Sequence, residues 1–341
     1  MNISQGVEVA LSRRAQIYRS IMKRVLGSRT ISLEELRLGN GIKSLPPILL
    51  PRGIEFQSVV VGGQPPSDGV SVPPGRRGAA VALEGSFEAE WVVPVNKPGP
   101  LVVMHLHGGG YVSGSPELYR MLTSQMAVCA GVPVFVPDYR LAPEHPFPAA
   151  LEDARIAWQH LLDMGYDTRH IALTGDSAGG GLALSLVQSL RDEGRELPAA
   201  LVLMSPWTDL PLSGGTYRIK AGDEVVLSEA SLGEWASMYA GNTPLADPGV
   251  SPLFGRLEGL PPMLVQVGTE ELLLDDSVRL AEKAKAAGVD IDLRIWEGLW
   301  HVWQMLGSLV PENEDSFAEI ATFLRKHLTA RPGAEQKTEG I

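Results

Sequence analysis

The stretch that decides the fold runs from residue 171 to residue 181 and reads Ile171-Ala172-Leu173-Thr174-Gly175-Asp176-Ser177-Ala178-Gly179-Gly180-Gly181. Its first three residues are apolar, as in a buried strand. Leucines then recur at every fourth position, which is the period of one helix face, at Leu182, Leu186 and Leu190. A strand, a Gly-x-Ser-x-Gly corner and a helix form the layout of a nucleophile elbow. Ser177 would expose its hydroxyl at that corner, with room left by Gly175 and Gly179.

This motif alone leaves two interpretations open. Gly-x-Ser-x-Gly also occurs by chance, so residues 175–179 could be a glycine-rich turn that merely precedes a helix. The choice between a turn and a nucleophile therefore depends on the rest of the chain.

A second glycine-rich stretch follows the apolar run Leu101–Met104 and reads His105-Leu106-His107-Gly108-Gly109-Gly110-Tyr111. Glycines after a strand leave backbone N–H groups unobstructed. Acyl transfer needs such donors where negative charge grows on the carbonyl oxygen. Gly109, Gly110 and Ala178, the residue after the serine, are the predicted oxyanion-hole donors. We expect His107 to brace the loop; the competing interpretation is a flexible loop.

A serine hydroxyl is a weak nucleophile that needs an adjacent base. In an α/β-hydrolase this base follows the acid, beyond the final strand. Five of the seven histidines precede Ser177, and His327 lies within the expected closing helix. His301 alone follows the last expected strand, in the stretch 297–303. The order of the chain therefore predicts His301 as the base.

The acid is expected in the loop after the apolar run Met263–Val267, and four carboxylates follow there. Asp275 and Asp276 lie at the expected start of the next helix, where they would serve N-capping and the helix dipole. Glu270 and Glu271 lie in the loop itself, near the carboxyl end of the strand. Position alone does not separate the two glutamates.

The organisation of the chain is that of a mainly parallel α/β sheet. Five short, nearly all-apolar runs are typical of strands buried on both faces. They are 101–104, 132–136, 170–173, 200–203 and 263–267. Helical patterns separate or follow these runs, at about 117–130, 149–164, 178–193 and 274–287. A strand at 291–296 and a closing helix complete the series, and the runs 58–61 and 79–93 predict earlier, antiparallel strands joined by a turn at 62–75.

Two segments stand outside this alternation and are predicted to form a cap. Residues 1–50 are mainly helical, with a capping box at Ser32 and Glu35 and one apolar face. That face consists of Tyr18, Ile21, Met22, Val25 and Leu26. Residues 209–248 are an insertion with a helical centre at about 228–239. The hydrolase core would then comprise 51–208 and 249–329, and the polar tail 330–341 is expected to be disordered.

Composition excludes several classes of function. Forty acidic and twenty-nine basic residues leave a net charge of −11, so we expect no nucleic acid or anionic membrane as a partner. The single cysteine, Cys129, excludes an intrachain disulfide and a cysteine-based zinc site. There is no H-E-x-x-H motif and no membrane-length apolar run, and we expect no signal peptide, because the N-terminal residues contain no continuous apolar core. We therefore expect a cytoplasmic protein with no metal.

Several motifs together carry a family resemblance over nearly all of residues 95–330. They are His107-Gly108-Gly109-Gly110, Tyr139-Arg140-Leu141-Ala142-Pro143-Glu144, Gly175-Asp176-Ser177-Ala178-Gly179-Gly180, Ser205-Pro206-Trp207 and Ser251-Pro252-Leu253. The chain thus resembles the bacterial hormone-sensitive-lipase-like carboxylesterases, the H family or family IV of the α/β-hydrolases. The resemblance implies a mostly parallel sheet of about eight strands, flanking helices, a helical cap and no cofactor.

The resemblance also implies which carboxylate is the acid. In the family it occupies the first place of a D-P-L-x-D-E pattern, thirty residues before the histidine. That place is Glu271 here, since 301 − 271 is 30. The chain departs from the family in having Glu for Asp, and Leu272 for the common Pro. A glutamate can orient an imidazole equally well; Asp275 is the alternative.

The predicted activity is hydrolysis of short- to medium-chain carboxylic esters through Ser177, His301 and Glu271. Six side chains are candidates for the substrate pocket, and each could equally be packing within the cap: Tyr111, Trp207, Leu212, Trp235, Met238 and Tyr239. An amide or aryl-acylamide hydrolase is the alternative enzyme. A small-molecule-binding protein of the same fold is disfavoured, because both Ser177 and His301 are present. The sequence leaves a homodimer open.

Overall fold

The computed structural model describes residues 11–25, 32–39, 50–62, 86–95 and 99–328. The predicted tail 330–341, most of the predicted turn 62–75 and the first part of the predicted strand 79–93 lie outside these ranges. No helix within the described ranges combines the length and the apolar character that a membrane-spanning segment needs.

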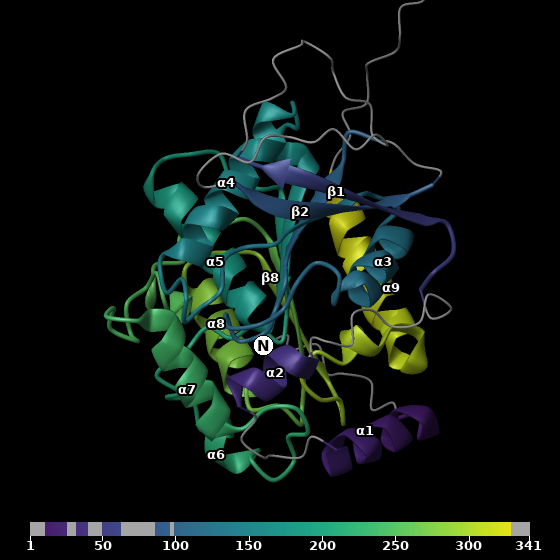
Figure 1. Ribbon diagram of the computed structural model, residues 1–341, viewed down its shortest axis with the longest axis vertical. Coiled ribbons are helices and arrows are strands. Elements are labelled where there is room, and N and C mark those ends of the chain that lie inside the picture. The colour runs from purple at the N-terminus through teal and green to yellow at the C-terminus, as the bar shows by residue number, and fades with distance from the viewer. Residues whose placement is uncertain (1–10, 26–31, 40–49, 63–85, 96–98, 329–341) are drawn as a thin grey trace, which may run out of the picture.

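An eight-stranded sheet forms the centre of the described structure (Figure 1), in the order β1-β2-β4-β3-β5-β6-β7-β8. The strands are β1 (Ile54–Val61), β2 (Phe87–Pro94), β3 (Val102–Leu106), β4 (Val134–Pro137), β5 (Ile171–Asp176), β6 (Ala200–Met204), β7 (Met263–Gly268) and β8 (Ile291–Trp296). β2 is antiparallel to both of its neighbours, and every later pair is parallel. This is the predicted α/β-hydrolase sheet, with the antiparallel strands first.

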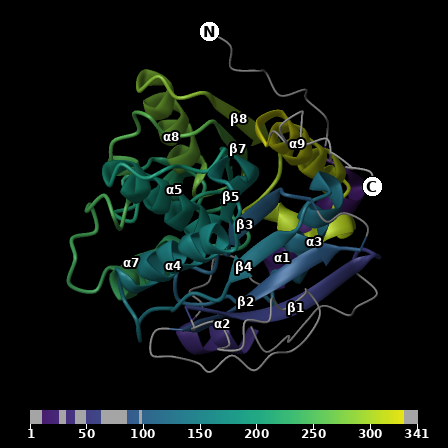
Figure 2. The same cartoon turned by 90° about the horizontal axis from the view of Figure 1, so that it is seen from above.

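Helices cover both faces of this sheet. The helices of the described residues are α1 (Arg13–Val25), α2 (Leu33–Gly39), α3 (Arg120–Ala130), α4 (Ala149–Asp163), α5 (Ser177–Asp192), α6 (Thr216–Ile219), α7 (Glu229–Ala240), α8 (Leu274–Ala286) and α9 (Glu312–His327). The 3₁₀ helices are η2 (Thr168–His170), η3 (Pro252–Phe254) and η4 (Trp303–Leu309). α4, α5 and α8 lie on one face, and α3 and α9 on the other (Figure 2). α3 begins three residues later than predicted because residues 116–120 form turns with i→i+3 hydrogen bonds.

The two faces of the sheet bury separate apolar clusters, because successive strand residues point to opposite sides. In β6, Leu201 and Leu203 pack with α4, α5 and α8, whereas Val202 packs with α3 and α9. The central strands β3 to β7 are buried along their whole length. This double burial explains why these strands are nearly all-apolar runs in the sequence.

The two predicted cap segments contribute helices to one end of the molecule, where α1, α2, α6 and α7 gather in the lower part of Figure 1. The capping box of α2 is present: the Ser32 N–H donates to Glu35 at 3.1 Å, and the Glu35 N–H donates to the Ser32 hydroxyl at 3.2 Å. In α1, Tyr18 and Met22 pack inward, but Ile21 and Val25 are 51% and 63% exposed. The predicted apolar face of α1 is therefore only partly buried.

Candidate active site

The predicted elbow is a sharp turn between β5 and α5. Ser177 has a φ of 49°, a left-handed conformation that a non-glycine residue adopts only under strain. A β-carbon at Gly175 would lie 2.3 Å from the Gly179 carbonyl oxygen, and one at Gly179 would lie 2.0 Å from the Leu106 carbonyl oxygen. Glycine is thus required at both positions by close backbone approach, as the sequence predicted. The turn is also held to the end of β6, since the Trp207 N–H donates to the Ser177 carbonyl oxygen at 2.8 Å.

His301 brings its imidazole to this serine from the loop after β8. Its Nε2 lies 2.9 Å from the Ser177 Oγ, and both side chains are almost completely buried. A base within this distance can accept the hydroxyl proton when the oxygen attacks. The two residues are 124 positions apart in the chain, so only the parallel order of β5 and β8 in one sheet brings them together.

Glu271 is the carboxylate that reaches the imidazole. Its Oε2 lies 3.0 Å from His301 Nδ1, and its Oε1 accepts hydrogen bonds from the Gly268 N–H and the Ser205 hydroxyl at 2.6 and 2.7 Å. Both carboxylate oxygens therefore have partners, and the group is fully buried. Glu270, which sequence position did not separate from Glu271, pairs instead with Arg19 and lies 3.8 Å from Lys220 Nζ.

The charges around His301 favour its protonated form. Burial lowers the pKa of His301, but the hydrogen bond and negative charge of Glu271 oppose this effect. The charges of Glu224 and Asp176 act in the same direction as Glu271, so that the pKa of His301 is raised overall. An imidazolium formed during proton transfer from Ser177 is therefore stabilised by its surroundings.

The glycine loop after β3 lies against the elbow. Gly109 and Gly110 have φ values of 111° and 66°, a region that favours glycine. The Gly109 carbonyl oxygen accepts hydrogen bonds from the Val112 N–H, the Ser113 N–H and the Ser113 hydroxyl. The carbonyl side of this peptide is thus fully engaged within the loop. Ala178, the third predicted donor, is buried in the first turn of α5.

Asp176 connects the glycine loop to the elbow. Its Oδ1 accepts from the Gly108 N–H at 3.0 Å, its Oδ2 accepts from the Tyr119 hydroxyl at 3.2 Å, and His105 Nε2 lies 3.3 Å away. Burial lowers the pKa of the nearby His107 to about 4, so its ring is neutral near pH 7. His107 stacks on Tyr139 with ring centroids 4.2 Å apart and bonds the Gly108 carbonyl oxygen. This arrangement fits the bracing role expected of His107.

Most of the predicted pocket side chains belong to one aromatic cluster between core and cap. Tyr111 stacks on Tyr239 of α7 with ring centroids 3.6 Å apart, and Trp207 lies beside Tyr111. All three are buried. Trp235 of α7 covers the glycine loop, because a β-carbon at Gly110 would lie 2.6 Å from its ring. The other two candidates, Leu212 and Met238, are half-buried.

Two residues near the triad have no predicted role. Ser205 donates to Glu271 and accepts from the Val302 N–H at 3.3 Å, so it joins the loops of the acid and of the base. Ser205 could have been identified from its motif, because it directly follows β6, the neighbour of both β5 and β7. Glu224 lies in the cap insertion, in no recognisable pattern, and nothing in the sequence points to it.

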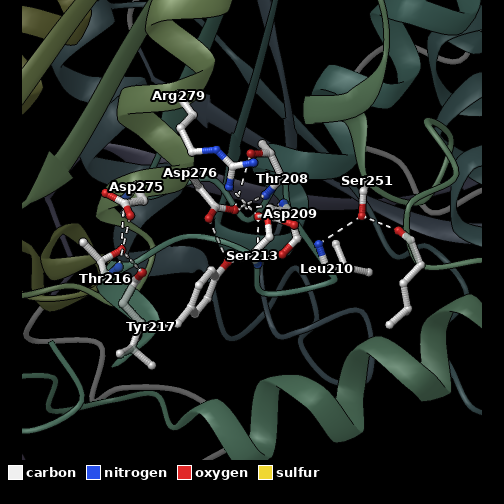
Figure 3. A network of polar contacts seen from close by, with 12 residues as sticks. Thr208, Asp209, Leu210, Ser213, Thr216, Tyr217, Ser251, Asp275, Asp276 and Arg279 are labelled. Carbon is white, nitrogen blue, oxygen red and sulfur yellow. Dashed lines mark hydrogen bonds and ion pairs between the residues drawn. The ribbon is translucent and has the colours of Figure 1, made fainter. Parts of the chain in front are cut away.

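The base of the cap insertion is joined to α8 by a buried polar network (Figure 3). Asp276 accepts hydrogen bonds from the Thr208 and Asp209 N–H groups at 2.8 and 2.9 Å, and from the Tyr217 hydroxyl at 2.7 Å. Asp275 accepts from the Thr216 N–H at 3.0 Å. Both aspartates lie in the first turn of α8, as predicted. Asp275, the alternative acid, is thus engaged in this network.

In the part of the chain that the structure describes, no group of three His, Cys, Asp or Glu side chains could hold a metal ion.

Comparisons with known proteins identify the family of the chain. Residues 103–305 match a protein family whose members have the α/β-hydrolase fold. An acetyl-hydrolase of Streptomyces hygroscopicus is 41% identical over 256 residues, which cover 75% of this chain and 84% of that protein. A solved esterase of the bacterial hormone-sensitive lipase family is 36% identical, with a TM-score of 0.82 over 94% of this chain and all of the other. A crystal of the esterase EstE5 soaked with p-nitrophenyl butyrate gives 32% identity and the same TM-score over the same shares.

The matched family covers more than half of the chain, and the similar esterases are aligned over most of their own length. Their likeness extends through the strands and loops that carry Ser177, Glu271 and His301. The chain therefore belongs to the bacterial hormone-sensitive-lipase family of esterases, within the α/β-hydrolase superfamily.

Proposed function

We propose that this protein is a carboxylesterase that hydrolyses short- to medium-chain esters through a Ser177–His301–Glu271 triad and an acyl-enzyme intermediate. The observation that carries the proposal is the continuous hydrogen-bonded line from the Ser177 Oγ through the His301 ring to the Glu271 carboxylate, with distances of 2.9 and 3.0 Å. A nucleophile bonded to a base, which is oriented by a third group, is the arrangement that acyl transfer requires.

In the proposed reaction, His301 Nε2 takes the hydroxyl proton as the Ser177 Oγ attacks the ester carbonyl carbon. Glu271 holds the imidazole in the required orientation through Nδ1 and stabilises its positive charge. The N–H groups of Gly109, Gly110 and Ala178 would bind the oxyanion. His301 then protonates the leaving alcohol. Water, deprotonated by His301, attacks the acyl-enzyme and releases the acid and the free serine.

The preference for short to medium acyl chains is supported by the cover over the site. The Trp235 ring contacts the position where a Gly110 side chain would be, so the cap lies directly on the glycine loop. A covered, aromatic site suits a small ester better than an emulsified triglyceride. We include Tyr111, Trp207, Leu212 and Met238 in the proposed substrate-binding region. The names of the acetyl-hydrolase relative and of the p-nitrophenyl butyrate-soaked esterase agree with this substrate class.

The test is a chain-length series of p-nitrophenyl esters from acetate to palmitate, with matching p-nitroanilides. We expect the highest kcat/KM at short to medium chains and slower hydrolysis of the anilides. Ser177→Ala should leave only residual activity, with kcat lowered about 10⁶-fold, and should abolish labelling by an organophosphate. Undiminished labelling of Ser177→Ala would contradict the proposed nucleophile, and fastest turnover of long-chain emulsions would contradict the proposed substrate class.

The cytoplasmic location of the protein and its assembly into a homodimer remain predictions. Cell fractionation and sedimentation velocity of the purified protein test them.

A further inference from the structure

Glu224 is a buried carboxylate contributed to the site region by the cap. It lies between α6 and α7 and is only 1% exposed. Its Oε1 accepts hydrogen bonds from the Val225 and Val226 N–H groups, both at 2.8 Å, and its Oε2 accepts from the Leu272 N–H at 3.1 Å. A buried carboxylate is costly unless it is paired and hydrogen-bonded, so this residue calls for an explanation.

The bond to Leu272 connects Glu224 to the proposed acid. Leu272 directly follows Glu271, whose own carboxylate is held from the other side by the Gly268 N–H. The end of β7 therefore holds the Glu271 carboxylate, and the cap holds the peptide between Glu271 and Leu272. Loss of the Glu224 carboxylate would leave the Leu272 N–H buried without an acceptor and free this peptide to shift.

The segment that carries Glu224 also lies against the loop of the base. Val225 is fully buried in a cluster with Leu299 and Trp300, the two residues before His301, and with Ala15 of α1. Glu224 is thus held beside both loops of the triad, between the core and the N-terminal part of the cap.

The carboxylates whose charges act on His301 are Glu271, Glu224 and Asp176. Glu271 contacts the ring, and Asp176 is shared among partners in the glycine loop. Burial and the charge of Glu271 raise the pKa of Glu224, and they outweigh the charge of His301 and the N–H groups of Val226 and Leu272, so that this pKa is raised overall. All three atoms that contact its oxygens are N–H donors, which favour the ionised form.

We propose that Glu224 is a positioning residue of the triad, supplied by the cap, which fixes the peptide carrying Glu271 and adds a second negative charge that stabilises the His301 imidazolium. This inference rests on the proposed function. It makes the cap insertion part of the catalytic apparatus in addition to its role as a cover over the substrate.

The experiment compares Glu224→Gln with Asp223→Asn in the full-length protein. Asp223 is the adjacent carboxylate, with a side chain 48% exposed and 3.8 Å from Lys220, so its substitution is a matched removal of charge at the surface. The readouts are kcat and KM for p-nitrophenyl butyrate, and the pH dependence of kcat/KM. Because the neutral imidazole is the active base, kcat/KM rises as pH passes the pKa of His301.

For Glu224→Gln we expect kcat to fall about tenfold with KM within about twofold. Removal of a negative charge lowers the pKa of His301, so the acid limb should move to lower pH by about half a unit or more. Asp223→Asn should match the wild type in both respects. Glu224→Asp keeps the charge on a shorter side chain, so its limb should stay at the wild-type pH even if kcat falls.

An unshifted acid limb in Glu224→Gln, or an equal shift in Glu224→Asp, overturns the inference. If Glu224→Gln fails to fold, the test is the pH dependence of organophosphate labelling in Glu224→Asp. An acid limb of this labelling profile that is displaced from its wild-type position contradicts the proposed role. Failure of the proposed function looks different, because Ser177→Ala would then retain the wild-type activity whatever happens at Glu224.

Discussion

Two pairs of carboxylates follow β7 within eight residues, and they face different parts of the molecule. Glu270 and Glu271 lie in the loop, where Glu271 contacts His301 and Glu270 pairs with Arg19 of α1. Asp275 and Asp276 lie in the first turn of α8 and bind the base of the cap insertion (Figure 3). The chemistry of the four side chains is nearly the same. What separates them is the direction in which the backbone presents each one.

Under the proposed function, a buried acid serves the reaction or joins the cap insertion to α8, depending on the groups to which it is hydrogen-bonded. Glu271 keeps one oxygen for an imidazole, a partner that changes its protonation state. Asp276 binds only backbone N–H groups and hydroxyls, which keep their protons. Substitution of Glu271 should therefore change catalysis, and substitution of Asp276 should change stability.

The largest expected effect is that of Glu271→Ala. Without its carboxylate, the imidazole loses both its orientation and the charge that stabilises its protonated form. We expect kcat/KM for p-nitrophenyl butyrate to fall about 10³–10⁴-fold with little change in KM. Near-normal activity of this variant, together with an inactive Asp275→Ala, would show that the acid has been assigned to the wrong residue.

The second effect is on stability. Asp276→Ala removes the acceptor of four buried donors, so we expect the free energy of unfolding to fall by about 3 kcal/mol. Equilibrium urea denaturation followed by tryptophan fluorescence measures it. In the variant that remains folded, kcat at 25 °C should stay within about threefold of the wild type. A kcat loss comparable to that of Glu271→Ala would erase the distinction between the two pairs.

The third expectation concerns pH. Burial raises the pKa of Asp276 to about 7 from an ordinary value of 3.8, although its hydrogen-bond donors oppose the shift. Between these values the folded protein holds a proton that the unfolded chain has released. The contribution of Asp276 to stability is therefore present below about pH 4 and is lost as pH rises through about 7. Urea denaturation from pH 4 to 8 should show a smaller decline in Asp276→Asn than in the wild type.

The smallest effect is expected for Asp275→Ala. Asp275 accepts one hydrogen bond from the Thr216 N–H and is only half-buried. We expect a loss of about 1 kcal/mol in stability and activity within about twofold of the wild type. The same measurements as for Asp276→Ala test this, and a larger loss of stability than in that variant would reverse the order of the two aspartates.

Much of the site could be predicted because chain order limits the choices. Ser177 follows a recognisable strand and precedes a recognisable helix, and His301 is the one histidine between the last predicted strand and the closing helix. A parallel arrangement of the later strands was predicted, since apolar runs of this length alternate with helices. The choice of Glu271 needed the family resemblance, because both glutamates occupy the same loop.

Other features could not be read from the chain. Ile21 and Val25 continue the apolar pattern of α1 but stay exposed, since no described element covers that side of the helix. Glu224 has no motif, and its role depends on a peptide 48 residues further along the chain. Such contacts depend on how the cap folds back on the core, which local patterns do not encode.

The sequence by itself determined the elbow at Ser177, the glycine loop, the base and the alternation of strands and helices. These follow from steric limits, periodicity and chain order, all of which act locally. Only the tertiary structure decided where Asp275 and Asp276 are directed, and that Glu224 of the predicted cap lies beside the loops of Glu271 and His301. The reason is physical: burial and hydrogen-bond partners define the state of a carboxylate, and both come from distant parts of the chain.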